Sequence, residues 1–191
     1  DIPDPPTPGS AETASELAFL HQRVAAEMSE ASQALMLEEA APGEFTERFR
    51  KNAPIAEPLA HCSAVLLKTA DRELQYFVLH YKRRFSRPRP TQLSPTLHPR
   101  IAIPGHPAYP SGHAAQGRLA SLILVRLKPE AGAVVLKFGR AVGRRREWAG
   151  VHYPSDTEAG WMLAEQVLAG LMNQPTFAAQ FAEAQQCLNQ N

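Results

Sequence analysis

Apolar residues recur at helical spacing along most of the chain, and no segment alternates between apolar and polar residues as a strand does. In the segment that follows the N-terminus, for example, Leu17, Leu20 and Val24 fall on one helical face. The pattern predicts helices over residues 13–40, 58–82, 111–129, 129–148, 155–172 and from 175 onward. We therefore expect an all-α protein, a single-domain bundle of about six main helices.

Prolines mark the segments that are not helical. Residues 1–10, DIPDPPTPGS, contain four prolines and predict an extended tail, which we bound at residues 1–12. The remainder, residues 13–191, is expected to form one all-α domain. Residues 86–110 contain seven prolines and predict a long loop inside that domain. Loops of this length in compact domains often carry function, so we expect this one to border an active site.

Charge and composition exclude several classes of protein. Twenty Lys and Arg residues oppose 19 Asp and Glu residues, for a net charge of +1, which argues against a nucleic-acid-binding protein. No apolar stretch is long enough to span a membrane, so the chain is expected to be soluble. The sequence does not indicate an oligomeric state. Two cysteines, Cys62 and Cys187, are compatible with one disulfide in an oxidising compartment and equally with two buried thiols.

A basic cluster lies at the end of the helix predicted for residues 58–82. It has the sequence KRRFSRPRP, from Lys82 to Pro90. Alone, such a run is typical of a solvated helix C-terminus. However, Pro88 and Pro90 hold Arg89 in an extended segment, and a fixed guanidinium suits a phosphate group, to which Lys82 would add a point charge.

Two further clusters lie at predicted helix starts. In the first, Ser111 is expected to cap a helix whose first turn holds Gly112 and His113, and such a helix start can bind an anion. In the second, His152 precedes a helix that we expect to be capped by Ser155 and Glu158, with Asp156 in its first turn. Taken singly, each cluster is also compatible with ordinary helix capping. An Asp beside one imidazole nitrogen would leave the other free as a nucleophile.

Together, the clusters resemble the three-part signature of the type 2 phosphatidic acid phosphatase superfamily. This superfamily includes bacterial nonspecific acid phosphatases, lipid phosphatases and vanadium haloperoxidases. The matching residues are Lys82-x6-Arg89-Pro90, Pro110-Ser111-Gly112-His113 and Arg146-x5-His152-x3-Asp156. They span residues 82–156, and the first eighty residues contain no motif of the signature. One position departs from the signature, because Arg145 stands where the family usually has Ser.

The resemblance implies a metal-independent phosphomonoesterase. It implies that His152, oriented by Asp156, attacks phosphorus to form a phosphohistidine, while His113 serves as general acid and base. It also implies that the phosphate oxygens are bound by Lys82, Arg89, Ser111, Gly112 and Arg146. The substrate is expected to be a small phosphorylated molecule, with lipid phosphates among the candidates, and phosphate, vanadate or similar oxyanions are expected ligands.

Two other functions remain open on the sequence. The same site would serve a haloperoxidase with vanadate as its cofactor, although the family's haloperoxidases are generally much longer chains. A non-catalytic module that binds anions or nucleic acid would use only the basic clusters. The chain begins at Asp1 and not at Met, which fits a removed secretory signal and equally a shortened sequence. With the resemblance, this favours a periplasmic or secreted protein.

Overall fold

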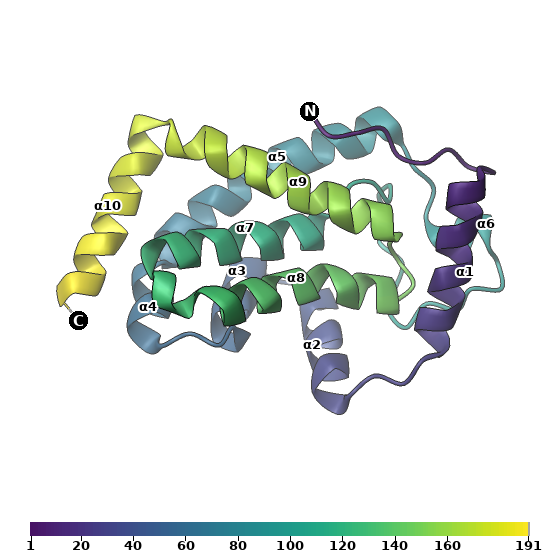
Figure 1. The fold of residues 1–191 in the computed structure, drawn as a ribbon, viewed down its shortest axis with the longest axis horizontal. Helices are drawn as coiled ribbons and strands as arrows, with labels where there is room; N and C mark the ends of the chain where they lie inside the picture. Colours follow the sequence, from purple (N-terminus) through teal and green to yellow (C-terminus); the bar gives the residue numbers. More distant parts are fainter. Residues whose placement is uncertain (191) are drawn as a thin grey trace.

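The computed structural model describes residues 1–190, and no strand occurs within them (Figure 1). The all-α prediction is confirmed. The helices are α1 (Ala11–Ala25), α2 (Glu30–Ala40), α3 (Phe45–Asn52), α4 (Glu57–Cys62), α5 (Ala64–Phe85), α6 (Pro90–Leu93), α7 (Gly112–Leu127), the 3-10 turn η1 (Pro129–Ala131), α8 (Gly132–Trp148), α9 (Pro154–Met172) and α10 (Pro175–Gln190). None of them is long and apolar enough to cross a membrane.

The structure divides two of the predicted helices. The segment predicted as 13–40 forms α1 and α2, because Ser29 starts a new helix by accepting a hydrogen bond from the Ser32 N–H. The segment predicted as 58–82 forms α4 and α5, which meet at the buried Ser63. The helices α3 and α6 were not predicted. Each is too short for a hydrophobic period to be read from it.

Helix α7 packs against α5, α8 and α9 (Figure 1). Small residues allow the close approach of its neighbours. A Cβ atom at Gly139 of α8 would lie 2.4 Å from the Gly117 carbonyl oxygen of α7, and one at Gly160 of α9 would lie 2.6 Å from the Ser111 carbonyl oxygen. The N-terminus of α7 therefore lies directly against α9. The main core fills the spaces between these helices, with fully buried side chains that include Leu66, Leu74, Leu119, Ile123, Leu124, Val135 and Val142.

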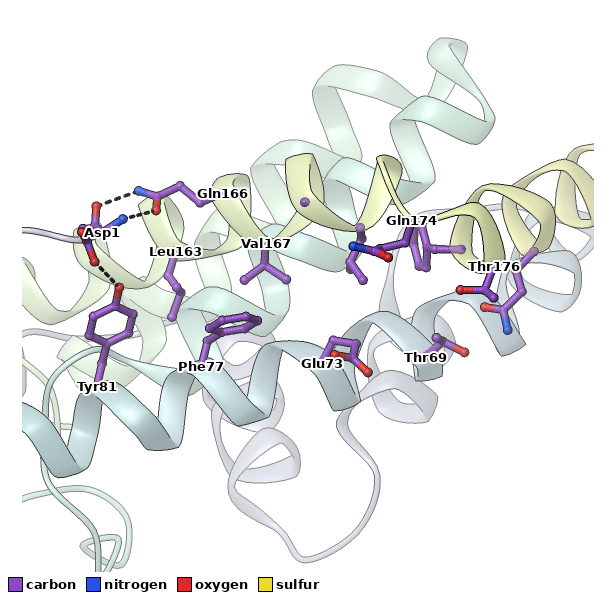
Figure 2. A pocket seen from close by; sticks show the side chains of 14 residues that line it. Asp1, Thr69, Glu73, Phe77, Tyr81, Leu163, Gln166, Val167, Gln174 and Thr176 are labelled. Atoms are coloured by element: carbon purple, nitrogen blue, oxygen red, sulfur yellow. Dashed lines mark hydrogen bonds between the residues drawn. The ribbon is translucent and has the colours of Figure 1, made fainter.

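The proline-rich N-terminal segment is packed on the bundle. Ile2 is buried in the main core. The terminal ammonium group of Asp1 donates to Gln166 Oε1 over 2.9 Å, and the Tyr81 hydroxyl donates to Asp1 Oδ1 over 3.1 Å (Figure 2). Asp1 thus fixes the start of the segment to α5 and α9, and the chain then leads to α1 (Figure 1). A cavity of about 530 Å³ beside Asp1 is lined by α5, α9 and α10, and contains none of the site residues that the sequence predicts.

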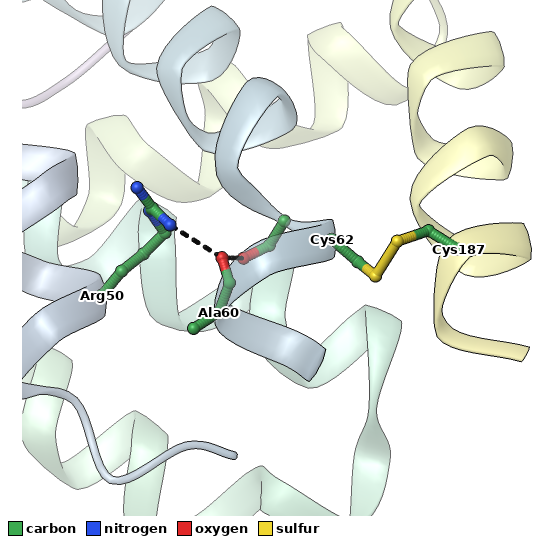
Figure 3. The surroundings of a disulfide bond; sticks show 5 residues. Arg50, Ala60, Cys62 and Cys187 are labelled. Carbon is green, nitrogen blue, oxygen red and sulfur yellow. Dashed lines mark hydrogen bonds between the residues drawn. A yellow bond between two sulfur atoms is a disulfide. The ribbon is translucent and has the colours of Figure 1, made fainter. Parts of the chain in front are cut away.

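A disulfide joins the two cysteines, which decides between the alternatives that the sequence leaves open. Cys62 at the end of α4 is bonded to Cys187 of α10, across 125 residues of sequence (Figure 3). In the same region, Arg50 of α3 donates to the Ala60 carbonyl oxygen of α4. The bridge lies at the end of the molecule where α4 and α10 meet, opposite α1 and α6 (Figure 1).

Removing the disulfide is expected to lower stability without changing the cavity described below. For the double variant Cys62→Ser/Cys187→Ser, we expect the free energy of unfolding to fall by about 3 kcal/mol, because a long loop is no longer closed in the unfolded chain. The corresponding fall in melting temperature is roughly 6–12 °C for a chain of this size. Thermal unfolding with and without reductant measures this effect. Equal melting temperatures for the wild type and the variant under oxidising conditions would contradict it.

Candidate active site

The residues that the motifs single out come together at one end of the bundle. Here α5 and α8 end, α7 and α9 begin, and the loop between α6 and α7 passes over them (Figure 1). A cavity of about 410 Å³ lies at this point, and five of the predicted residues line it: Lys82, Gly112, His113, Arg146 and His152. Arg89 lines an adjoining cavity of about 530 Å³, and His106 lines both cavities.

His152 is held in one tautomer by its two neighbours. Its Nδ1 lies 3.0 Å from Asp156 Oδ2, and its Nε2 lies 3.0 Å from Arg89 Nη1. A guanidinium can only donate, so Nε2 carries a lone pair and Nδ1 carries the proton. Burial lowers the pKa of His152 well below its usual value, and Arg89 and Lys82 lower it further. The side chain is therefore a neutral imidazole whose Nε2 carries a free lone pair.

Asp156 is buried behind His152, and every contact it makes is with a donor. Oδ2 accepts from His152 and from the Tyr153 N–H, each over 3.0 Å, and Oδ1 accepts from Arg87 over 2.6 Å. Burial raises the pKa of Asp156, while Arg87 and the Tyr153 N–H oppose this rise. Because three donors surround it, the group is a carboxylate. It also caps α9 at its third position, so the predicted capping by Ser155 and Glu158 is wrong.

Arg87 connects Asp156 to the N-terminal helix. It is buried, and its Nη1 also donates to Ser155 Oγ, while its Nη2 donates to Glu16 Oε2 of α1 over 2.8 Å. The Ser155 N–H in turn donates to Glu16 Oε1 over 2.7 Å. The solvated helix C-terminus that the basic run alone favours therefore does not describe Arg87, which is buried and salt-bridged. Nothing in the sequence around Glu16 indicates that this side chain contacts residues of a site so distant in the chain.

The two cations of the first motif are held by backbone carbonyl groups. Lys82 Nζ donates to the carbonyl oxygens of Pro107 and Ala108, over 2.7 and 3.2 Å. Burial lowers the pKa of Lys82 to about 7, with a further lowering from Arg89. Arg89 donates to the carbonyl oxygens of His106 and Val151, and burial lowers its pKa to about 10. The loop and the 149–153 turn therefore fix both cations beside His152.

His113 points its Nε2 at the Glu39 carbonyl oxygen of α2, over 2.9 Å. A carbonyl oxygen only accepts, so Nε2 carries a proton and Nδ1 is the atom that gains or loses one. Burial lowers the pKa of His113 to about 3, and the charge of Arg146 lowers it further. The sequence motif places His113 in the first turn of α7, as observed, but gives no indication that α2 orients it.

Ser111 and Gly112 form the start of α7. Ser111 caps the helix as predicted, since its Oγ accepts from the Ala114 N–H over 3.3 Å. It is fully buried and does not line the 410 Å³ cavity, whereas Gly112 does. The Ser111 N–H donates to the Asp156 carbonyl oxygen over 2.9 Å, which joins the starts of α7 and α9. The hydroxyl of Ser111 therefore supports the site from behind its surface.

Arg146 reaches the cavity from the last turn of α8. Its Nη2 donates to the Met36 carbonyl oxygen over 2.7 Å and to Glu39 Oε2 over 3.1 Å. Burial lowers its pKa, and Glu39 opposes that effect. No group of three or more His, Cys, Asp or Glu side chains within residues 1–190 is placed to hold a metal ion. The charged side chains that line the 410 Å³ cavity are the cations Lys82 and Arg146, and Arg89 lies beside His152 in the adjoining cavity.

The lowered pKa of Lys82 predicts that anion binding depends on pH. Below about pH 7 the ammonium is present and attracts an anion, and above it the ammonium must first take up a proton. Sulfate keeps its charge in this range, so its affinity should fall by up to about tenfold per pH unit above the pKa. Calorimetric titration at several pH values measures this, with Lys82→Met expected to abolish the dependence and exposed Lys137→Met to retain it. A pH-independent affinity in the wild type would contradict it.

The chain belongs to the PAP2 superfamily, whose profile matches residues 59–179. Two non-specific acid phosphatases are similar to part of it. That of Providencia stuartii is 36% identical over 77 residues, which are 40% of this chain and 31% of the relative. That of Salmonella typhimurium is 34% identical over 82 residues, which are 43% of this chain and 33% of the relative. The chain thus spans about a third of the length of the curated relatives it matches.

The fold is also found in a solved structure. A bacterial vanadium-dependent chloroperoxidase superimposes on 98% of this chain and 51% of its own, with a TM-score of 0.68 and 14% sequence identity. At this identity the likeness concerns the helical fold alone. The all-α fold predicted from the hydrophobic pattern is therefore shared with this neighbour along nearly the whole chain, including the first eighty residues, which contain no motif of the signature.

Proposed function

We propose that the protein is a metal-independent phosphomonoesterase that forms a phosphohistidine on His152. The observation that carries the proposal is the state of the His152 imidazole and its place in the cavity. Its Nε2 bears a lone pair, its Nδ1–H is held by a buried carboxylate, and it lines a cavity beside Lys82 and Arg146. This arrangement combines an oriented nucleophile with cations that neutralise a phosphoryl group. Partial similarity to acid phosphatases supports the same function.

In the first step, the lone pair of His152 Nε2 attacks phosphorus. A P–N bond forms as the P–O bond to the leaving group breaks, and the leaving oxygen takes a proton from His113 Nδ1. The equatorial oxygens lie against Lys82, Arg89 and Arg146 and against the start of α7. Asp156 stabilises the positive charge that develops on the imidazole ring, as a carboxylate does in other oriented histidine systems.

In the second step, water hydrolyses the phosphohistidine. His113 Nδ1, now unprotonated, accepts a proton from the attacking water as the new P–O bond forms and the P–N bond breaks. The electron pair of the P–N bond returns to His152 Nε2, and inorganic phosphate leaves the site. Both histidines are then restored, and no other reactant is consumed.

The first step requires His113 to be protonated while His152 is neutral. In the free site, burial and the neighbouring cations lower the pKa of both histidines. A phosphate dianion between these cations would offset their charge and so raise the pKa of His113. The hydrogen bond to the Glu39 carbonyl oxygen also raises this pKa. Turnover is thus expected to be bell-shaped in pH, with an acidic optimum.

We propose that the substrate is a small phosphate ester. The cavity that His152 lines is open on one side, where the side chains of Leu79 and Ile103 are 56% and 47% exposed. Apolar side chains at this point suit an apolar leaving group, which includes aryl phosphates and lipid phosphates in solution. The disulfide between Cys62 and Cys187 favours an oxidising compartment such as the periplasm.

A panel of phosphate esters assayed across pH tests the proposed function. Phosphate release at acidic pH, in the presence of a chelator, is the expected result, with higher kcat/KM for esters with apolar leaving groups. Bromide oxidation with added vanadate and peroxide is measured in parallel. Oxidation without phosphate release would favour a haloperoxidase, and tight, strongly salt-dependent binding of nucleic acid without either activity would favour a binding module.

A further inference from the structure

The C-terminal turn of α2 contacts the candidate active site at three points. The carbonyl oxygen of Glu39 accepts from His113, the carbonyl oxygen of Met36 accepts from Arg146, and the Glu39 carboxylate is paired with α8. The Glu39 carbonyl belongs to the last turn of α2, where carbonyl groups lack partners within the helix and suit cations, whereas the Met36 carbonyl lies just before that turn. Although no motif covers α2, its end is therefore part of the wall that faces the bound group.

The Glu39 carboxylate binds two consecutive arginines. Arg145 Nε lies 3.0 Å from both carboxylate oxygens, and Arg145 Nη2 makes a shorter contact with Oε1. Arg146 Nη2 lies 3.1 Å from Oε2. All three side chains are less than 10% exposed. Arg145 occupies the position where the signature usually has Ser, and a Ser side chain could not form this ion pair.

The charges of the three residues do not cancel. Glu39 and Arg145 neutralise each other, which leaves the charge of Arg146 available to a ligand. The Nε–H of Arg146 is buried and has no partner among residues 1–190, and Arg146 lines the 410 Å³ cavity. If Arg145 were neutral, the Glu39 carboxylate would be paired with Arg146 alone, and the charge of Arg146 would no longer be available to the bound phosphoryl group.

We propose that Glu39 is a positioning residue for Arg146 and that Arg145 is its counter-charge, so that this pair sets the affinity of the site for the phosphoryl group. The proposal rests on the function proposed above. The proposal assigns a role to the unusual Arg145. By neutralising Glu39, Arg145 allows Glu39 to hold the guanidinium of Arg146 without repelling the anion that Arg146 binds.

Calorimetric binding of inorganic phosphate at a fixed pH tests the proposal without requiring turnover. Arg145→Ser is expected to weaken phosphate binding on the order of 30-fold, because the buried Glu39 carboxylate then offsets the charge of Arg146. Glu39→Gln/Arg145→Ser removes both charges and is expected to bind within about threefold of the wild type. With substrate, the change in Arg145→Ser should appear mainly in KM, since Arg145 does not touch the reacting atoms.

Two further variants separate the proposal from a general effect on charge or folding. Exposed Arg140→Ser, which removes a positive charge from the same helix, is expected to leave phosphate affinity unchanged. Arg145→Lys keeps the counter-charge, although it loses the two-point contact with the Glu39 carboxylate, and is expected to bind phosphate within about tenfold of the wild type. If Arg145→Ser does not fold, the phosphate affinities of Arg145→Lys and of the double variant still test the proposal.

Three results would overturn the proposal. The first is an unchanged phosphate affinity in folded Arg145→Ser. The others are a folded double variant, or a folded Arg145→Lys, that binds phosphate at least about tenfold more weakly than the wild type. A wild-type protein that binds phosphate but releases none from esters would instead refute the proposed function. The two proposals can therefore fail separately, because one is measured by binding and the other by turnover.

Discussion

Replacing His152 by alanine is expected to lower kcat by about 10^4- to 10^6-fold, because the nucleophile of the first step is lost. The cations that bind the phosphoryl group remain, so the dissociation constant for inorganic phosphate should change by less than about tenfold. Arg89 loses one hydrogen-bond partner in this variant but keeps the carbonyl oxygens of His106 and Val151. Steady-state kinetics and calorimetric phosphate binding measure the two quantities.

The matched control is His61→Ala, an exposed histidine of α4 at the far end of the bundle. It is expected to keep wild-type kcat and KM. If His152→Ala retained kcat within tenfold of the wild type, the imidazole would not be the nucleophile. Loss of phosphate binding together with turnover would show instead that the variant had lost the arrangement of the site.

Replacing Asp156 by asparagine is expected to lower kcat by about 10^4-fold through the tautomer of His152. Arg87 donates to Oδ1 over 2.6 Å and requires an acceptor there, so the amide oxygen of the asparagine would stay with Arg87. The amide NH₂ would then face His152 Nδ1. Because this group only donates, Nδ1 would become the acceptor, and the proton would move to Nε2, where it blocks attack on phosphorus.

Nitrogen NMR of the labelled histidines distinguishes this mechanism from a loss of structure. The wild type is expected to show His152 protonated on Nδ1, and Asp156→Asn to show it protonated on Nε2. Glu158→Gln, an exposed change in the same turn of α9, should leave both the tautomer and kcat unchanged. An Nδ1-protonated His152 in Asp156→Asn, with kcat close to that of the wild type, would contradict the role given to the carboxylate.

The long helices and the meeting of the three motifs could be predicted from the sequence. The structure has six helices of 15 or more residues within residues 1–190, and each shows enough of the hydrophobic period to be recognised. The motif residues lie at helix ends, where sequence signals for caps and prolines are strong. His113 and His152 therefore line one cavity although 38 residues separate them in the sequence.

The support of the site from α1 and α2 could not be predicted. Glu16 and Glu39 lie in helices rich in Ala and Glu, where an acidic residue is ordinarily exposed. Both are buried because arginines from distant segments pair with them, Arg87 in one case and Arg145 in the other. Such pairs depend on which helices pack together, and a single sequence does not contain that information. The capping of α9 by Asp156 was missed for a related reason, since Ser155 offered an equally good sequence pattern.

Trapping the covalent intermediate tests the central claim most directly. Rapid acid-free denaturation of the enzyme during turnover of a good phosphate ester, followed by peptide mass spectrometry, is expected to find one phosphoryl group on His152. The modification should accumulate further in His113→Ala when an ester with a good leaving group is used, because hydrolysis of the intermediate then lacks its general base. Turnover with His152 unmodified, or with the phosphoryl group on another residue, would contradict the account.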